Sequence, residues 1–156
     1  MTSTLGFQVL APDRPRPPEP AICSGARVDD AAVAARPILV VDDDPEILAM
    51  LRDFLESEGL VVRTAANGAE ALDALDDVAP ALILLDMRMP VLDGWAFAER
   101  FHARSLTYPI VVMTAAESAR RWAEEIGATA YIAKPFDVNE LLETIERHRQ
   151  KGSKPN

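Results

Sequence analysis

Residues 81–94 have the sequence ALILLDMRMPVLDG, and their pattern gives the first indication of the fold. Its first five residues are apolar without alternation, and the run ends at the carboxylate of Asp86. Such a run is typical of a strand buried on both faces, as in a parallel sheet. Asp86 is then expected at the carboxyl end of the strand, the edge where open α/β sheets bind ligands. Pro90 and the turn-forming pair Asp93-Gly94 predict that a loop follows Asp86.

Similar apolar runs alternate with helical patterns on both sides of this stretch. Strands are expected at residues 37–41, 60–64, 81–85, 109–113 and 129–132, and helices are expected to begin near residues 45, 67, 94, 117 and 137. Five strand–helix units at this spacing predict an α/β fold with a parallel sheet between two layers of helices. Right-handed crossovers favour a doubly wound sheet with the strand order 2-1-3-4-5.

Composition separates the predicted domain from its ends. Residues 1–36 are rich in proline and alanine and are predicted to be a disordered tail, residues 37–150 to be the folded domain, and residues 151–156 to be a frayed end. The net charge is −9, and residues 1–36 carry four acids and four bases, so the whole acidic excess lies in residues 37–156. An acidic domain is expected to repel a nucleic-acid backbone.

The chain is expected to be cytoplasmic. No apolar run approaches the length of a membrane span, and the first ten residues lack the positive charge of a signal peptide. Cys23 is the single cysteine and cannot form an internal disulfide, which fits a reducing compartment.

Acidic side chains follow the first and third strands, which are neighbours in the predicted order. Asp42 and Asp43 should therefore meet Asp86. A like-charged pair about 4 Å apart costs roughly 4 kcal/mol at an effective dielectric of 20, so the acids either take up protons or bind a cation. All-oxygen ligands suit Mg²⁺ or Mn²⁺. We expect Asp43 and Asp86 to be direct ligands, Asp42 to act through water, and the backbone carbonyl of Arg88 to lie within reach.

A divalent ion at this edge favours phosphoryl chemistry. Asp86 is the candidate nucleophile, because carboxylates form aspartyl phosphates. Thr114 and Lys134 end the next two strands at the same edge. The Thr114 hydroxyl would bind a phosphoryl oxygen, and the Lys134 ammonium would bind the same group or the Asp86 carboxylate.

Each of these residues also has a structural interpretation when it is taken alone. The acids at 42–44 fit the N-terminus of a helix, Thr114 fits a strand end, and Lys134 fits a solvated loop. Their joint placement at the carboxyl ends of the strands favours a functional site. Trp95 and Trp122 are expected to serve packing alone.

Four motifs in register then resemble the receiver domain of two-component response regulators. They are the segments VDDD at 41–44, DMRMPVLDG at 86–94, MTA at 113–115 and YIAKPF at 131–136. The resemblance covers residues 37–150 and implies a flavodoxin/CheY-like (βα)₅ fold in a stand-alone receiver. It implies that Asp86 is the phosphoacceptor, that Asp42, Asp43, Asp86 and the Arg88 carbonyl form the Mg²⁺ site, and that Thr114 and Lys134 contact the phosphoryl group. It also makes Tyr131 an aromatic switch residue together with Thr114, where the residues alone indicate a half-buried strand aromatic.

The resemblance further implies a signalling domain rather than an enzyme that acts on other substrates. A sensor histidine kinase or a histidine phosphotransfer protein would supply the phosphoryl group. A downstream protein would bind the face formed by the last strand and the last two helices, with a phosphorylation-dependent homodimer left open. No domain that binds DNA is expected after residue 150.

Three alternative functions remain to be compared with these residues. A phosphatase of the haloacid-dehalogenase kind requires a second Asp two residues after the nucleophile, where this chain has Arg88. A nucleotide- or flavin-binding module requires a phosphate loop after the first strand, where three acids would repel phosphate. A pseudo-receiver, acting as an interaction module without phosphorylation, is the runner-up.

Overall fold

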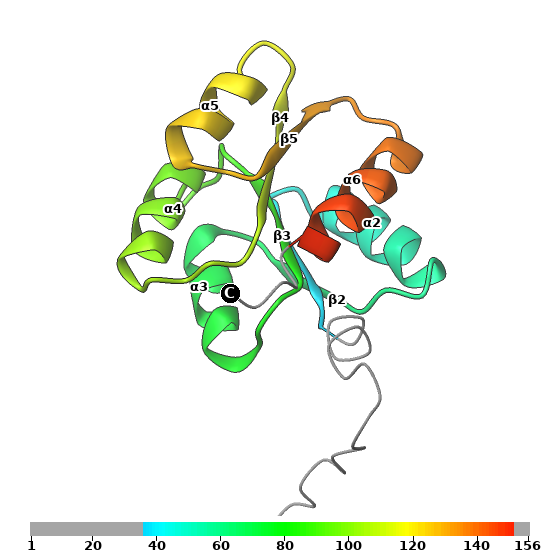
Figure 1. Cartoon of the computed structure of the whole chain (residues 1–156), viewed down its shortest axis with the longest axis horizontal. Helices are drawn as coiled ribbons and strands as arrows, with labels where there is room; N and C mark the ends of the chain where they lie inside the picture. Colours follow the sequence, from blue (N-terminus) through cyan, green and yellow to red (C-terminus); the bar gives the residue numbers. More distant parts are fainter. Residues whose placement is uncertain (1–35, 152–156) are drawn as a thin grey trace, which may run out of the picture.

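The apolar runs form one five-stranded sheet in the computed structural model, which describes residues 36–151 (Figure 1). Its strands are β1 (Ile38–Val41), β2 (Val62–Ala65), β3 (Leu82–Asp86), β4 (Ile110–Ala115) and β5 (Ala130–Lys134). All neighbouring strands are parallel and follow the order β2-β1-β3-β4-β5. This order confirms the predicted doubly wound sheet. The tails predicted for residues 1–36 and 151–156 lie outside the described residues, apart from Arg36 and Lys151.

Four of the five helices in the described residues begin where a side chain caps the first turn, and the helix that begins at Ala119 has no such cap. The helices are α2 (Pro45–Ser57), α3 (Gly68–Asp77), α4 (Gly94–Ala103), α5 (Ala119–Ile126) and α6 (Val138–Lys151). The side chains of Asp44, Asn67 and Asp93 accept hydrogen bonds from backbone N–H groups in the first turns of α2, α3 and α4, which satisfies donors that the helix itself leaves free. None of the helices in this described part of the chain is long and apolar enough to cross a membrane.

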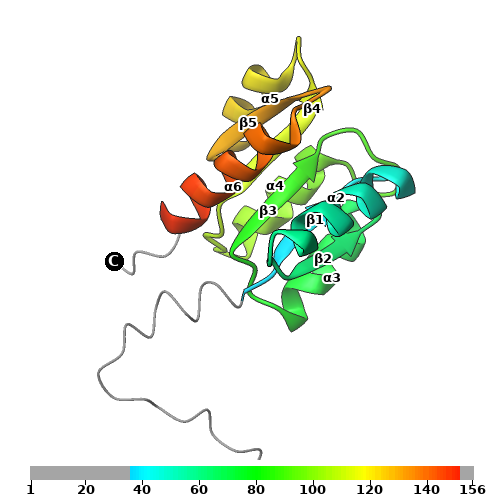
Figure 2. The ribbon, with the colours of Figure 1, turned by 90° about the vertical axis from the view of Figure 1, so that its right-hand side faces the viewer.

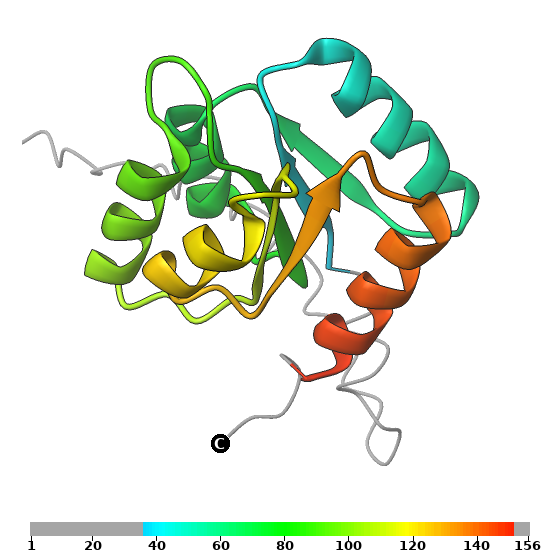
Figure 3. The same cartoon turned by 90° about the horizontal axis from the view of Figure 1, so that it is seen from above.

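Two helical layers cover the sheet. Helices α3, α4 and α5 lie on one face, and α2 and α6 lie on the other, as the view from above shows (Figure 3). Figure 2 shows α2 and α6 in front of the strands. Because strand side chains alternate between faces, β1 contributes Leu39 and Val41 to one core and Ile38 and Val40 to the other. The central strands are therefore apolar on both faces up to their carboxyl ends, as the sequence predicts.

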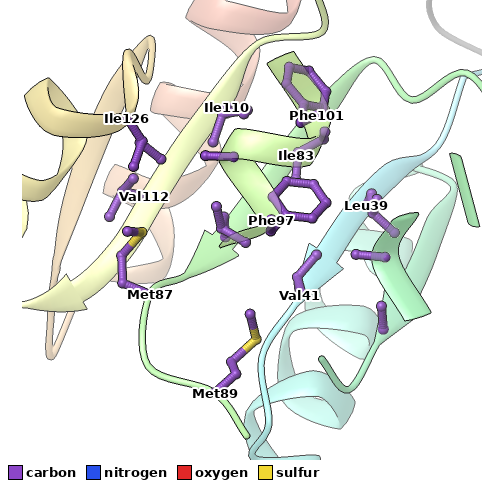
Figure 4. Packing of buried hydrophobic residues seen from close by; sticks show 14 of the residues in the cluster. Leu39, Val41, Ile83, Met87, Met89, Phe97, Phe101, Ile110, Val112 and Ile126 are labelled. Atoms are coloured by element: carbon purple, nitrogen blue, oxygen red, sulfur yellow. The ribbon is translucent and has the colours of Figure 1, made fainter. Parts of the chain in front are cut away.

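The core under α3, α4 and α5 extends to the loop that follows β3. Phe97 and Phe101 of α4 are buried against the sheet and stack with ring centroids 5.9 Å apart (Figure 4). Met87 and Met89, in the loop after Asp86, belong to the same buried cluster. This burial anchors the loop at two alternate positions, so that Arg88 between them is exposed.

Several element boundaries differ by one or two residues from the sequence expectation. β2 begins at Val62 because Leu60 belongs to the end of α2, where its N–H donates to the Leu55 carbonyl after Gly59 at φ +84°. β4 continues past Thr114 to Ala115, and α5 begins at Ala119 rather than at residue 117.

We predict that Gly94→Ala destabilises the protein by about 1–3 kcal/mol, the usual cost of overpacking. A Cβ at this position would lie 2.6 Å from the Met87 Sδ and 2.8 Å from the Met87 Cα, and backbone cannot move aside cheaply. Urea denaturation measures the loss. Gly59→Ala is the control, because a Cβ there meets nothing within 4 Å and only the positive φ is strained. If Gly94→Ala and Gly59→Ala change the NMR chemical shifts of the residues around Asp86 to the same extent, this account of the loop is wrong.

Candidate functional site

Three carboxylates meet at the carboxyl ends of β1 and β3. The register pairs Val41 with Leu85, so Asp42 and Asp86 are the next residues on neighbouring strands. Asp42, Asp43 and Asp86 each have a carboxylate oxygen within 4.8 Å of the other two. Asp42 is 1% exposed and Asp86 is 7% exposed, whereas Asp43 is exposed to solvent. The structure thus brings together the three acids that the sequence predicts to meet.

Lys134 supplies the positive charge nearest to these acids. Its Nζ lies 2.7 Å from the Asp42 Oδ2 and 3.8 Å from the Asp86 Oδ1. The sequence led us to expect a contact with Asp86, and the closer contact is with Asp42. Asp42 also accepts a hydrogen bond from the Asp44 N–H at 2.9 Å, so both of its oxygens are engaged.

Burial dominates the ionisation of Asp86. It raises the pKa of this carboxyl group from the ordinary 3.8 to about 6. The Lys134 ammonium lowers the pKa, the neighbouring Asp42 raises it, and the backbone N–H groups of Arg88 and Met87 lower it by hydrogen bonding. Asp86 is therefore mainly a carboxylate at neutral pH. An additional cation would reduce the free energy cost of this buried negative charge.

We predict that Asp86 makes the free energy of unfolding fall as pH rises in metal-free buffer. Its pKa is about 6 in the folded protein and 3.8 without the fold, so the folded state binds more protons between these values. The stabilisation is complete below pH 3.8 and is lost as pH rises through about 6, by at most about 3 kcal/mol. Urea denaturation of the wild type and Asp86→Asn with a chelator measures it. The wild type should lose stability relative to the variant as pH rises, and a constant difference would contradict the prediction.

Thr114 and Tyr131 take different positions around the acids. Met113 of β4 pairs with Asp86, so Thr114 is one residue further toward the same edge, and it is 3% exposed. Tyr131 on β5 is 47% exposed and lies in a hollow between α5 and α6 that His148 also lines. The residues alone indicated a half-buried strand aromatic at this position, and the exposed fraction of Tyr131 agrees with it. The switch role of both residues stays a prediction.

Backbone hydrogen bonds hold the loop after Asp86 in its conformation. The Gly94 N–H donates to the Met87 carbonyl at 3.0 Å, and the Leu92 carbonyl accepts from the Gly68 N–H at 3.0 Å. Within the loop, the Leu92 N–H donates to the Pro90 carbonyl at 2.8 Å, across a Val91 with φ +69°. Arg88 is two residues after Asp86, and its backbone N–H is one of the groups that lower the pKa of the Asp86 carboxyl group. That the Arg88 carbonyl is a metal ligand stays a prediction.

The donor set fits a hard divalent cation. If all three acids are ionised, Lys134 offsets only one of the three negative charges that lie within 4.8 Å of one another. Carboxylate oxygens are the ligands that Mg²⁺ and Mn²⁺ prefer. The exposed Asp43 also opens the cluster to solvent, which leaves room for water ligands.

Sequence reasoning missed two aromatic residues near the acids. Trp95 lines an open hollow together with Asp43, Met87, Arg88, Met89, Pro90 and Asp93. The Arg88 guanidinium carbon lies 5.0 Å from the centroid of the Trp122 ring. The position of Trp95 directly after Gly94 in the sequence could have indicated that Trp95 lies near the acids. Nothing local in the sequence marks Trp122, which reaches the site from α5.

The chain that carries this arrangement is similar to known proteins. A sequence profile described as the response regulator receiver domain matches residues 38–146. The DNA-binding transcriptional regulator NtrC of Escherichia coli (strain K12) is 38% identical over 123 residues, which cover 76% of this chain and 26% of that protein. Sporulation initiation phosphotransferase F of Bacillus subtilis (strain 168) is 34% identical over 113 residues, covering 71% of this chain and 91% of that protein.

A solved structure agrees with the fold. The receiver domain of NtrX from Brucella abortus aligns with a TM-score of 0.67 at 34% identity, covering 72% of this chain and 98% of that one. Several of the curated relatives are longer, and the chain spans between about a quarter and about half of their length.

Proposed function

This chain belongs to the response regulator receiver family of signalling domains, and from that premise we propose that it accepts a phosphoryl group on Asp86. The observation that carries the proposal is the set of three carboxylates within 4.8 Å of one another, with Lys134 in contact with two of them. A sensor histidine kinase or a histidine phosphotransfer protein would be the donor. The reaction is a transfer to the chain's own side chain, and later hydrolysis of the product would reset it.

In the proposed transfer, an Asp86 carboxylate oxygen forms a bond to phosphorus. The P–N bond of the donor's phosphohistidine breaks, and the leaving imidazole nitrogen takes up a proton. Asp86 must be ionised to attack, and its pKa of about 6 leaves it ionised at neutral pH. Lys134 would move from its contact with Asp42 toward the new phosphoryl oxygens, and the buried Thr114 hydroxyl would donate to one of them.

Asp42, Asp43 and Asp86 would hold one Mg²⁺ ion, with the Arg88 carbonyl as a further ligand. When bound, the ion would supply positive charge that offsets the charge of the acids and of the phosphoryl group. The proposed signal is then read from the surface of α5, β5 and α6 by a downstream protein or a second copy of the chain. Thr114 and Tyr131 would link the phosphoryl group to that surface.

The test is incubation of the purified chain with a small acyl phosphate and Mg²⁺, followed by intact-mass measurement. One phosphoryl group per chain, absent when a chelator replaces Mg²⁺, is the expected result. The alternative, a pseudo-receiver that acts by contact alone, predicts no mass gain under any of these conditions. Assays against a panel of histidine kinases would then identify the natural donor.

A further inference from the structure

The Arg88 side chain connects the loop after Asp86 to helix α5. Its guanidinium lies over the face of Trp122 in α5, 5.0 Å from the ring centroid, a geometry in which the ring attracts a cation. Arg88 is also only two residues after Asp86, and its backbone N–H lowers the pKa of the Asp86 carboxyl group. The Arg88 main chain thus lies next to the phosphoacceptor, and its side chain contacts α5.

Trp122 is itself held in place by neighbours on two helices. The Trp95 ring from α4 meets it edge to face, with centroids 4.9 Å apart and an interplanar angle of 71°. The Trp95 Nε1 donates to the Glu125 Oε2 at 3.1 Å, and the Arg121 Nε donates to the Glu125 Oε1 at 2.9 Å. These bonds keep the pKa of Glu125 below its ordinary value. We refer to the Arg88–Trp122 pair as the tryptophan clamp.

We propose that the tryptophan clamp couples Asp86 to α5, with Trp122 as the positioning residue that holds the Arg88 guanidinium until a phosphoryl group on Asp86 draws it away. The inference rests on the proposed function, because it requires a charged group on Asp86. It defines a route to α5 that is separate from Thr114 and Tyr131.

Electrostatics indicate which way the Arg88 guanidinium moves when Asp86 carries a phosphoryl group. Asp43 and Asp93 line the same hollow as Arg88, yet the guanidinium lies over the Trp122 ring. The attraction between a guanidinium and a ring face in solvent is weak, whereas charge-assisted hydrogen bonds to phosphoryl oxygens are among the strongest in proteins. A phosphoryl group on Asp86 adds such oxygens next to the residue that carries the guanidinium. We therefore expect Arg88 to leave the ring, which removes one of the contacts that hold α5 to the loop.

Tryptophan fluorescence tests the inference. The chain has two tryptophans, so Trp95→Phe leaves Trp122 as the only indole. In that background, fluoroberyllate with Mg²⁺ mimics the phosphoryl group and should change the Trp122 emission. Adding Arg88→Met should reduce the change by more than half. Arg88→Lys, which retains a cation, should restore part of it, and Arg52→Met, an exposed arginine of α2, should leave it intact.

A ¹⁹F NMR resonance of bound fluoroberyllate reports loading of Asp86 separately from the clamp. No bound resonance in the unsubstituted chain would refute the proposed function, and the inference with it. A bound resonance with an unchanged Trp122 response in Arg88→Met would refute the inference alone. So would a response that Tyr131→Leu abolishes and Arg88→Met preserves, because the coupling would then run through Tyr131.

Discussion

Asp86→Asn will abolish phosphoryl incorporation from a small acyl phosphate in the presence of Mg²⁺. The amide of asparagine has no anionic oxygen to attack phosphorus, and the other buried acid of the cluster, Asp42, has both oxygens engaged by the Asp44 N–H and Lys134. The fold should survive, because burial already raises the pKa of Asp86 and so opposes its charge. Intact-mass measurement of the wild type and the variant gives the result.

The matched control for this prediction is Asp53→Asn, which changes an exposed acid of α2 and should be labelled as fully as the wild type. Hydroxylamine should release the label, since it cleaves acyl phosphates and spares phosphate esters of serine and threonine. If Asp86→Asn is labelled to the wild-type extent, the nucleophile is another residue.

Asp43→Ala should weaken Mg²⁺ binding by at least about a hundredfold. Loss of a group that only orients a metal ligand costs up to about a hundredfold in affinity, and loss of a direct ligand should cost at least as much. Asp43 is the exposed member of the cluster, so its removal leaves the core intact. Isothermal titration with Mg²⁺ measures the affinity, and thermal unfolding in chelator should match the wild type.

Asp44→Ala, at the residue next to Asp43, is the control with the opposite expectation. The Asp44 side chain accepts from the Glu46 N–H and caps α2, so its loss should cost about 1 kcal/mol of stability and leave Mg²⁺ affinity unchanged. A wild-type Mg²⁺ affinity in Asp43→Ala would remove Asp43 from the proposed metal site.

The strand order was accessible from the sequence because it depends on local pattern and on general rules of chain connection. Unbroken apolar runs such as 82–85 can satisfy both faces only inside a layered sheet, and right-handed crossovers then leave few topologies. The same reasoning placed the acids after β1 and β3 at one edge. It was less accurate at the ends of elements, where Leu60 serves the C-terminus of α2 rather than β2.

The details of the site depend on distances between residues far apart in the chain. Lys134 and Asp42 are 92 residues apart, and nothing in either segment favours this pair over Lys134 with Asp86. The Arg88–Trp122 contact likewise requires α5 to pack beside the loop after β3. A pattern in the sequence indicates which face of a helix is buried. It does not indicate which side chain of another element packs against that face.

The five-stranded parallel sheet, and the edge at which its acids, hydroxyl and ammonium group lie, follow from the periodicity and length of each apolar run. The pairing of those groups depends on the tertiary structure. The folded structure placed Lys134 on Asp42, raised the pKa of Asp86 by burial, and laid Arg88 on Trp122. Ion pairing, desolvation and ring contacts act over a few ångströms, and that scale is set by packing between elements rather than by any one of them.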